Sequence, residues 1–234
     1  MWIKICGNTS LADAQLAASV GASAVGFIFA PSPRRVTIDQ VRTITPHLPR
    51  NVDRYGIFVN ATFDEIVSTV EQAGLTGVQL HVNDDSDLPR RLRGRFPAQG
   101  QAAPFGIIAV LPFSTDLQQQ LIAASQDAAV DAILIDSRTA VAYGGTGIRY
   151  DWQAAQTPFH SVAPQRRLIV AGGLDPDNVA EAIHTLQPWG VDVVSGVEAA
   201  PGRKDSEHVA AFVRNAREAF AELASASRRD RQNA

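Results

Sequence analysis

The sequence predicts an α/β fold, a single-domain (β/α)8 TIM barrel with short loops. Two observations lead to this prediction. Short apolar, β-branched segments alternate with amphipathic helical segments eight times along 234 residues, which leaves little length for loops. Most of the apolar segments are continuously hydrophobic, as expected of parallel strands that are covered on both faces. A doubly wound open sheet is the alternative, but no Gly-x-Gly-x-x-Gly pattern follows the first segment.

The eight predicted strands share short length and strong apolar character. They span residues 2–6, 24–29, 54–59, 77–81, 106–111, 132–136, 167–171 and 191–195.

Capping residues mark the starts of several predicted helices. A serine opens the helix predicted over 10–20, and a Thr-Phe-Asp-Glu capping box opens the helix over 62–73. Asp175 precedes a proline that suits the first position of a helix over 176–186. The last predicted helix spans 205–223.

The chain shows no internal domain boundary. We therefore predict one barrel over residues 1–223 and a frayed polar tail over 224–234. The segment 97–104 is a predicted loop on the amino-terminal face of the barrel, away from any chemistry.

Composition restricts the partners of this chain. A net charge of −3 gives no reason to expect nucleic acid, and no uncharged apolar run is long enough to cross a membrane. One cysteine excludes an internal disulfide, and no side-chain cluster has metal-ligand spacing, so we expect no metal. We expect a cytoplasmic monomer rather than a homodimer, and a small anionic ligand remains possible because backbone N–H groups can hold an anion without a basic surface.

Two titratable side chains lie at predicted strand ends, where the chemistry of such barrels takes place. Cys6 ends the first strand, and a thiol there suits a base or a nucleophile, although buried cysteines also serve as small packing residues. Asp136 ends an otherwise apolar strand and faces Cys6 across the predicted barrel. Partial burial would raise the pKa of this carboxyl and suit it to general-acid work, while capping of the next loop is the alternative.

Glycines follow the last two predicted strands. Gly172 and Gly173 come after the seventh strand. Ser195 ends the eighth strand, and Gly196 follows it. Barrels often bind phosphate with the backbone N–H groups of these two loops, and glycine lets the backbone approach the ligand. Tight turns without a ligand are the alternative.

Three further features lie on the same predicted face. Arg34 and Arg35 stand between prolines and either bind an anion or remain solvated. His81 suits a ligand contact, an acid–base role or a structural hydrogen bond. The segment 137–149 contains Gly144-Gly145-Thr146-Gly147, which is typical of a mobile lid or a flexible turn.

Short segments from residue 3 to about residue 220 match one known family in that family's order. They are Lys4-Ile5-Cys6-Gly7, Ala24-Val25-Gly26-Phe27, Ser32-Pro33-Arg34-Arg35-Val36, Gly56-Ile57-Phe58-Val59-Asn60, Val78-Gln79-Leu80-His81, Leu134-Ile135-Asp136, Gly144-Gly145-Thr146-Gly147, Asp151-Trp152, Ala171-Gly172-Gly173-Leu174, Asn178-Val179, Val191-Asp192-Val193-Val194-Ser195-Gly196-Val197-Glu198 and Pro201-Gly202-Arg203-Lys204-Asp205. Through them the chain resembles the phosphoribosylanthranilate isomerase family of tryptophan biosynthesis.

The resemblance implies an Amadori rearrangement of N-(5′-phosphoribosyl)anthranilate to 1-(2-carboxyphenylamino)-1-deoxyribulose 5-phosphate, without metal or organic cofactor. It implies that Asp136 is the general acid that protonates the ribose ring oxygen and that Cys6 is the general base that removes the C2′ proton. Arg35 and His81 would contact the substrate. The phosphate would lie on Gly172, Gly173, Ser195 and Gly196.

Some positions depart from the family pattern. Val194 stands where serine is commoner, and we expect it to point away from the ligand. Val82-Asn83 follows His81 in place of glycine, and Tyr150 replaces phenylalanine. Because an ordinary thiol has a pKa of about 8.5, we predict that a nearby cation or aligned backbone N–H groups lower the pKa of Cys6.

Other functions need different residues. Indole-glycerol-phosphate synthase would need a catalytic lysine pattern. The aminoaldose isomerase of histidine synthesis would need aspartates on strands one and five, where this chain has Cys6 and Leu111-Pro112-Phe113. A barrel that only binds a phosphorylated ligand would need the glycine loops but not Cys6 and Asp136 together.

Overall fold

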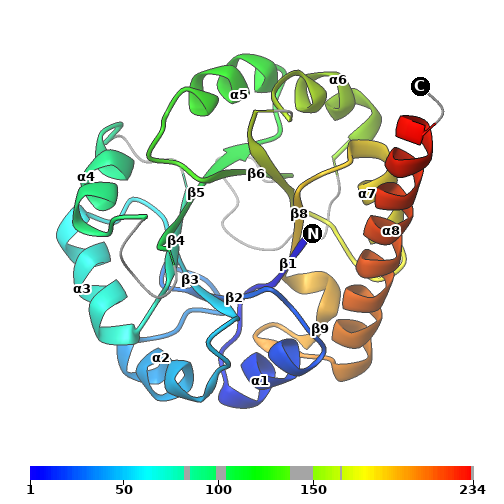
Figure 1. The fold of residues 1–234 in the computed structure, drawn as a ribbon. Coiled ribbons are helices and arrows are strands. Elements are labelled where there is room, and N and C mark those ends of the chain that lie inside the picture. The colour runs from blue at the N-terminus through cyan, green and yellow to red at the C-terminus, as the bar shows by residue number, and fades with distance from the viewer. Residues whose placement is uncertain (82–84, 99–103, 138–149, 164, 233–234) are drawn as a thin grey trace.

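Eight parallel strands close into a barrel that helices surround (Figure 1). The computed structural model describes residues 1–81, 85–98, 104–137, 150–163 and 165–232. Each strand pairs with its sequence neighbour, and β1 pairs with β8 through four residue partners to complete the closure. The predicted fold class is confirmed, and the open-sheet alternative is wrong.

The strand ends differ from the predicted ones by one or two residues at most. The barrel strands are β1 (Trp2–Ile5), β2 (Ala24–Ile28), β3 (Asp53–Phe58), β4 (Gly77–Leu80), β5 (Gly106–Pro112), β6 (Ala132–Asp136), β7 (Arg167–Val170) and β8 (Gly190–Val193).

Helices follow the strands, and shorter elements fill some connections. The helices are α1 (Leu11–Ser19), α2 (Ile38–Ile44), α3 (Phe63–Ala73), α4 (Leu88–Arg95), α5 (Leu117–Ser125), α6 (Trp152–Val162), α7 (Val179–Leu186) and α8 (Ser206–Gln232). The short elements are the 3-10 turns η1 (Thr45–His47) and η2 (Ser195–Val197) and a two-stranded hairpin of β9 (Glu198–Ala200) and β10 (Arg203–Lys204).

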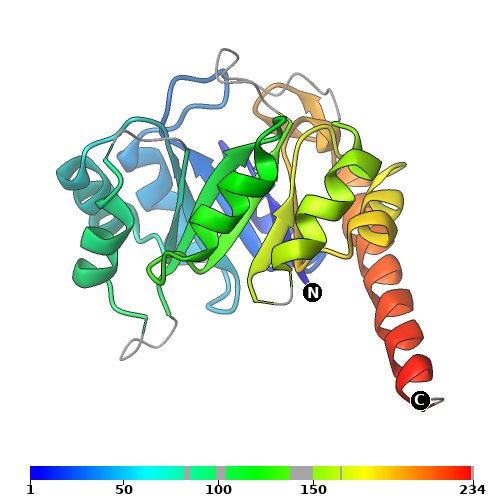
Figure 2. The ribbon, with the colours of Figure 1, turned by 90° about the horizontal axis from the view of Figure 1, so that it is seen from above.

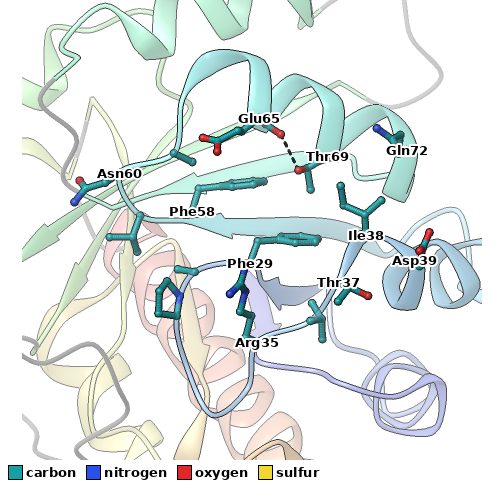
Figure 3. A pocket seen from close by; sticks show the side chains of 15 residues that line it. Phe29, Arg35, Thr37, Ile38, Asp39, Phe58, Asn60, Glu65, Thr69 and Gln72 are labelled. Atoms are coloured by element: carbon teal, nitrogen blue, oxygen red, sulfur yellow. Dashed lines mark hydrogen bonds between the residues drawn. The ribbon is translucent and has the colours of Figure 1, made fainter.

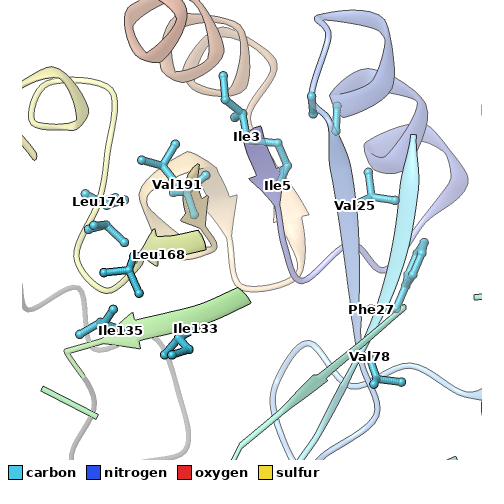
Figure 4. Close-up of a cluster of buried hydrophobic side chains, with 14 of the residues drawn as sticks. Ile3, Ile5, Val25, Phe27, Val78, Ile133, Ile135, Leu168, Leu174 and Val191 are labelled. Carbon is cyan, nitrogen blue, oxygen red and sulfur yellow. The ribbon is translucent and has the colours of Figure 1, made fainter. Parts of the chain in front are cut away.

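Alternation along the strands separates an outer core from the barrel interior. Ile3 and Ile5 of β1 belong to the large cluster between strands and helices, which Figure 4 shows with side chains from neighbouring strands. Trp2 belongs instead to a second cluster with Tyr55 and Leu134. Because successive strand side chains point to opposite faces, Lys4 and then Cys6 continue the inner face that Trp2 begins.

Two of the predicted helix starts are confirmed. The Ser10 side chain accepts the Asp13 N–H at 3.1 Å and caps α1. Thr62 and Glu65 form the complete capping box of α3. These local hydrogen bonds satisfy N–H groups that the first turn of a helix leaves unpaired.

The start predicted for α7 is wrong by three residues. The Asp175 side chain accepts the backbone N–H groups of Asp177 and Asn178, at 2.9 and 3.0 Å, and so closes a turn before the helix begins at Val179. The Asn178 side chain then donates to the Gly173 carbonyl at 2.9 Å. This turn therefore connects the loop after β7 to α7.

The last helix extends further than predicted. Whereas we expected a helix end at residue 223 and a frayed tail beyond it, α8 continues to Gln232. Alanine and arginine are common in this segment, and both favour helix. Figure 2 shows the carboxyl end of α8 extending past the barrel. None of the described helices is long and apolar enough to cross a membrane.

Candidate active site

Cys6 and Asp136 lie at the carboxyl ends of two barrel strands that are not neighbours, β1 and β6. Cys6 directly follows β1, and its N–H donates to the Val193 carbonyl at 2.9 Å, which continues the pairing with β8. Asp136 ends β6 two residues after Leu134, a member of the inner cluster, so it shares that inner face. The two side chains are 2% and 4% exposed. The barrel therefore presents a thiol and a carboxyl at the same end of its interior.

A buried lysine lies one inner layer below Cys6. The Lys4 ammonium donates to Asp192 Oδ2 of β8 and to Gln79 Oε1 of β4, both at 2.8 Å. Lys4 is completely buried. Sequence reasoning missed this residue as a site component, although a lysine inside an otherwise apolar strand was a usable signal.

The Lys4 network reaches His81 through Gln79. The Nε2 atoms of Gln79 and His81 are 3.4 Å apart. The backbone N–H of His81 donates to the Phe58 carbonyl at 3.0 Å, which holds the residue beside the end of β3. His81 is therefore at the carboxyl end of the barrel, as predicted, while Val82-Asn83 falls outside the described residues.

A second ionic group joins the loops after β2 and β8. Arg34 donates to both carboxylate oxygens of Glu198, from Nε at 2.8 Å and from Nη2 at 2.7 Å. Lys204 donates to the same carboxylate at 3.2 Å and to the Val194 carbonyl at 3.0 Å. Arg34 is therefore neither solvated nor open to an anionic ligand, because Glu198 holds it.

The pKa of Cys6 is raised, so the predicted lowering is wrong. Burial of the thiol is the main cause, and the negative charge of Asp192 adds to it. The positive charges of Lys4 and Lys204 both act in the opposite direction. The expected nearby cations are present, but the loss of solvent around the thiol outweighs them.

The pKa values of Lys4 and Lys204 are shifted in opposite directions. Burial disfavours the charged form of both. For Lys4 the charges of Asp192 and Cys6 outweigh burial and raise its pKa, so it remains an ammonium. For Lys204 burial prevails over Glu198 and Cys6, and its pKa is lowered.

Val194 packs toward the site. It contacts the small inner cluster of Cys6, Ile28, Ala30 and Ile57, so our expectation that it points away is wrong. As the residue directly after β8, it lies two positions past inward-facing Asp192, and strand alternation gives it the same direction.

The four residues predicted to hold phosphate lie on two loops in direct contact. A Cβ atom on Gly196 would lie only 1.9 Å from the Leu174 carbonyl oxygen, so the loop after β8 touches the loop after β7. Gly172 and Gly173 have φ angles of 82° and 67°, which favour glycine. Ser195 and Gly196 begin η2. The structure thus brings these backbones together.

Arg35 has different surroundings from Arg34. It is exposed and lines an open cavity of about 600 Å³ with Phe29, Phe58 and Asn60 (Figure 3). The two phenylalanine rings stack with centroids 5.4 Å apart, at the carboxyl ends of β2 and β3. A guanidinium in this position can bind an anionic or aromatic part of a ligand.

Tyr150 is a buried neighbour of Asp136. Burial raises the pKa of Tyr150, and the negative charge of Asp136 raises it further. Its ring stacks on Phe113, with centroids 4.6 Å apart.

The predicted lid over 137–149 lies outside the described residues except for Ser137, and most of the predicted loop over 97–104 lies outside them too. Within the described part of the chain, no group of three potential ligand side chains is arranged for a metal ion.

A family model described as N-(5′phosphoribosyl)anthranilate (PRA) isomerase matches residues 3–215. Curated relatives named N-(5′-phosphoribosyl)anthranilate isomerase include one from Geobacter sp. (strain M21), 39% identical over 92% of this chain and 97% of the relative. Another, from Magnetococcus marinus, is 42% identical over 93% of this chain and 95% of the relative.

Solved structures of the same enzyme are also similar. The phosphoribosylanthranilate isomerase of Thermotoga maritima has a TM-score of 0.79 and 34% identity, over 93% of this chain and 99% of the other. A complex with reduced 1-(o-carboxyphenylamino)-1-deoxyribulose 5-phosphate has a TM-score of 0.76 and 32% identity, with the same coverage. A third structure, with the same values, is of monomers of the dimeric Thermotoga maritima enzyme.

Proposed function

The chain belongs to the N-(5′-phosphoribosyl)anthranilate isomerase family, and from this premise we propose that Asp136 and Cys6 divide its reaction as general acid and general base. The protein is an isomerase of tryptophan biosynthesis that converts an aldose into a ketose. One observation carries the assignment: a thiol and a carboxyl, both buried, share the inner face at the carboxyl end of the barrel.

Asp136 begins the reaction as an acid. Its carboxyl proton passes to the ribose ring oxygen, the C1′–O bond breaks, and the nitrogen lone pair forms a C1′=N bond. The product of this step is an open-chain Schiff-base cation. Burial of Asp136 supports the role, because it keeps the proton transfer away from bulk water.

Cys6 completes the reaction as a base. Its thiolate takes the proton from C2′, and the C–H electron pair forms a C1′=C2′ bond and neutralises the cation. The resulting enolamine tautomerises to the ketone. An acid and a base held on different strands allow both transfers without movement of the substrate between sites.

Backbone groups and two side chains position the substrate in this proposal. The phosphate binds to N–H groups of Gly172, Gly173, Ser195 and Gly196, where two loops meet beside a short helical turn. Arg35 and His81 contact the rest of the molecule. The location of Arg35 in an open cavity beside two aromatic rings supports this role.

The test follows consumption of fluorescent phosphoribosylanthranilate by the purified protein. We expect turnover by the wild type and a loss of at least about 10²-fold in kcat for Asp136→Asn. Asp131→Asn is the matched control. Asp131 lies just before β6, at the end of the strand opposite Asp136, and forms an ion pair with Arg93. A protein that binds the substrate without consuming it would instead be the non-catalytic barrel.

We also propose that the protein is a monomer, unlike the dimeric relative. Among the large hydrophobic side chains of the described residues, Met1 and Ile122 are the exposed ones, and they form no broad apolar face. Light scattering should give a mass near the 25.1 kDa of one chain. A mass of twice that value would refute the proposal.

A further inference from the structure

We propose that Lys4 is a positioning residue of this isomerase, whose buried ammonium, held by Asp192 and Gln79, stabilises the thiolate form of Cys6. Lys204 is the second cation whose charge acts on the same thiol. The inference rests on the proposed role of Cys6 as the base, and it names the groups that make that role possible.

The contacts of Lys4 fix the position of its ammonium inside the barrel. An ammonium has three N–H donors. Lys4 donates to Asp192 on β8 and to Gln79 on β4, each at 2.8 Å. The cation is therefore held by two strands of the barrel, one inner position below the thiol of Cys6.

Gly26 makes the approach of the two side chains possible. A Cβ atom at this position of β2 would lie 2.5 Å from Cys6 Sγ and 3.0 Å from Lys4 Cε. Both side chains therefore occupy the space that a larger residue would fill. The thiol and the lysine stem meet inside the barrel, on the side away from solvent.

Charge balance favours a thiolate in this surrounding. Among the described residues, the charges that act on Cys6 are the cations Lys4 and Lys204 and the carboxylate Asp192. Two positive charges thus oppose one negative charge while the thiol is neutral. Loss of the Cys6 proton completes the balance, whereas in a purely apolar cavity it would create an isolated charge.

A gain in folding stability does not by itself explain the buried ion pair of Lys4 and Asp192. Lys4 and Asp192 are 0% and 4% exposed, and a buried ion pair loses much of its Coulomb attraction to desolvation. The consequence of this pair is electrostatic. Burial raises the pKa of Cys6, and of the groups that lower it, Lys4 has the largest effect. Without Lys4, burial would act on the thiol with much less opposition.

The experiment uses the single cysteine as its own reporter. Because Cys6 is the only cysteine in the chain, isotope-labelled cysteine gives one NMR signal whose pH titration yields its pKa. The variants are Lys4→Met and the double variant Lys4→Met/Asp192→Asn, which removes both buried charges together. Arg93→Met is the control, since it removes an ion-paired arginine at the opposite end of the barrel.

We expect Lys4→Met to raise the pKa of Cys6 by one unit or more, in line with shifts of about 1–3 units for a neighbouring charge. At neutral pH, kcat should fall about tenfold with KM nearly unchanged, and alkaline pH should restore part of the rate. The double variant should shift the pKa in the same direction, and Arg93→Met should shift neither quantity.

The outcomes separate this inference from the proposed function. A folded Lys4→Met or double variant with the wild-type Cys6 pKa would overturn the role of Lys4. If Lys4→Met does not fold, the double variant decides. Normal turnover by Cys6→Ala would instead remove the base assignment itself. If Cys6→Ala is inactive but Lys4→Met keeps the wild-type pKa of Cys6, Cys6 remains the proposed base and only the role of Lys4 is refuted.

Discussion

At the residue scale, the site holds its thiol in a buried position that resists ionisation. Burial raises the pKa of Cys6, while Lys4 and Lys204 oppose that effect. The thiolate, which is the form of Cys6 that we propose as the base, is therefore a minority species of the resting protein at neutral pH, and its amount depends on pH. Sequence reasoning proposed Cys6 from its position but could not predict this balance, because the sequence shows neither the burial of the thiol nor the approach of Asp192 and Lys204 from the far end of the chain.

The raised pKa of Cys6 makes activity and stability change in opposite directions with pH. We expect kcat to rise between about pH 7 and about pH 9, because the thiolate fraction grows. The free energy of unfolding should fall above about pH 8.5, since the unfolded thiol ionises first and the folded state disfavours the charge.

Initial rates at saturating substrate and urea titrations across this pH range measure both effects. Cys6→Ala is the control, because it should remove the alkaline loss of stability that belongs to the thiol. A kcat that falls steadily over the same range would contradict a thiolate base.

The adjacent arginines Arg34 and Arg35 should respond differently to alanine substitution. Arg34→Ala leaves the Glu198 carboxylate with only the longer bonds from Lys204 and the Gly202 N–H, and it should cost roughly 3 kcal/mol of unfolding free energy. Arg35→Ala, at an exposed position, should cost less than about 0.5 kcal/mol but raise KM. Urea denaturation and steady-state kinetics of both variants measure this, and the opposite assignment of the two effects would show that Arg34 is the substrate contact.

At the element scale, local signals predicted most helix and strand positions. Continuous apolar runs identified all eight strands, and the capping residues Ser10 and Thr62 identified the starts of α1 and α3. The same reasoning failed at Asp175, which looks like a helix cap but closes a turn. The difference depends on Asn178 and the Gly173 carbonyl, a contact that one helix signal alone does not reveal.

The contact between the loops after β7 and β8 predicts a strong effect of one methyl group. Gly196→Ala places a Cβ atom against the Leu174 carbonyl, so the loops must separate. We expect a loss of about 1–3 kcal/mol of unfolding free energy and a marked rise in KM, because the proposed phosphate site would be distorted.

Gly94→Ala is the matched control for this substitution. It lies in α4 with open space around its Cβ position, and it should stabilise the protein by roughly 0.5–1 kcal/mol. Denaturant titrations and KM values for both variants test the prediction. Unchanged phosphate-substrate affinity in Gly196→Ala would place the phosphate elsewhere.

At the scale of the whole molecule, barrel topology brings the site together from most of the chain. Cys6 and Asp136 are far apart in sequence, and only closure of the sheet places them at one end of one interior. The sequence predicted this closure from the number of strand–helix units. It did not predict the inner layer of Lys4, Gln79 and Asp192, because their contacts depend on the register between strands.

The carboxyl end of α8 should be dispensable. Among the α8 side chains that the structure describes, Ala219 is the last buried one, and Phe220 and Leu223 are the last that pack against the core. We therefore propose that residues 1–223 form the complete folding unit. Truncation after Leu223 should change the unfolding free energy by less than about 1 kcal/mol and leave kcat unchanged. Thermal unfolding of both forms tests this, and loss of the cooperative transition would contradict it.

The initial rate of phosphoribosylanthranilate consumption by Cys6→Ala, relative to the wild type, tests the central claim most directly. Cys6 is the proposed base, and no other thiol in the chain can replace it. The account predicts a decrease in kcat of at least about 10²-fold, with an unchanged unfolding transition. A folded Cys6→Ala variant that turns over within about tenfold of the wild-type rate would contradict the account.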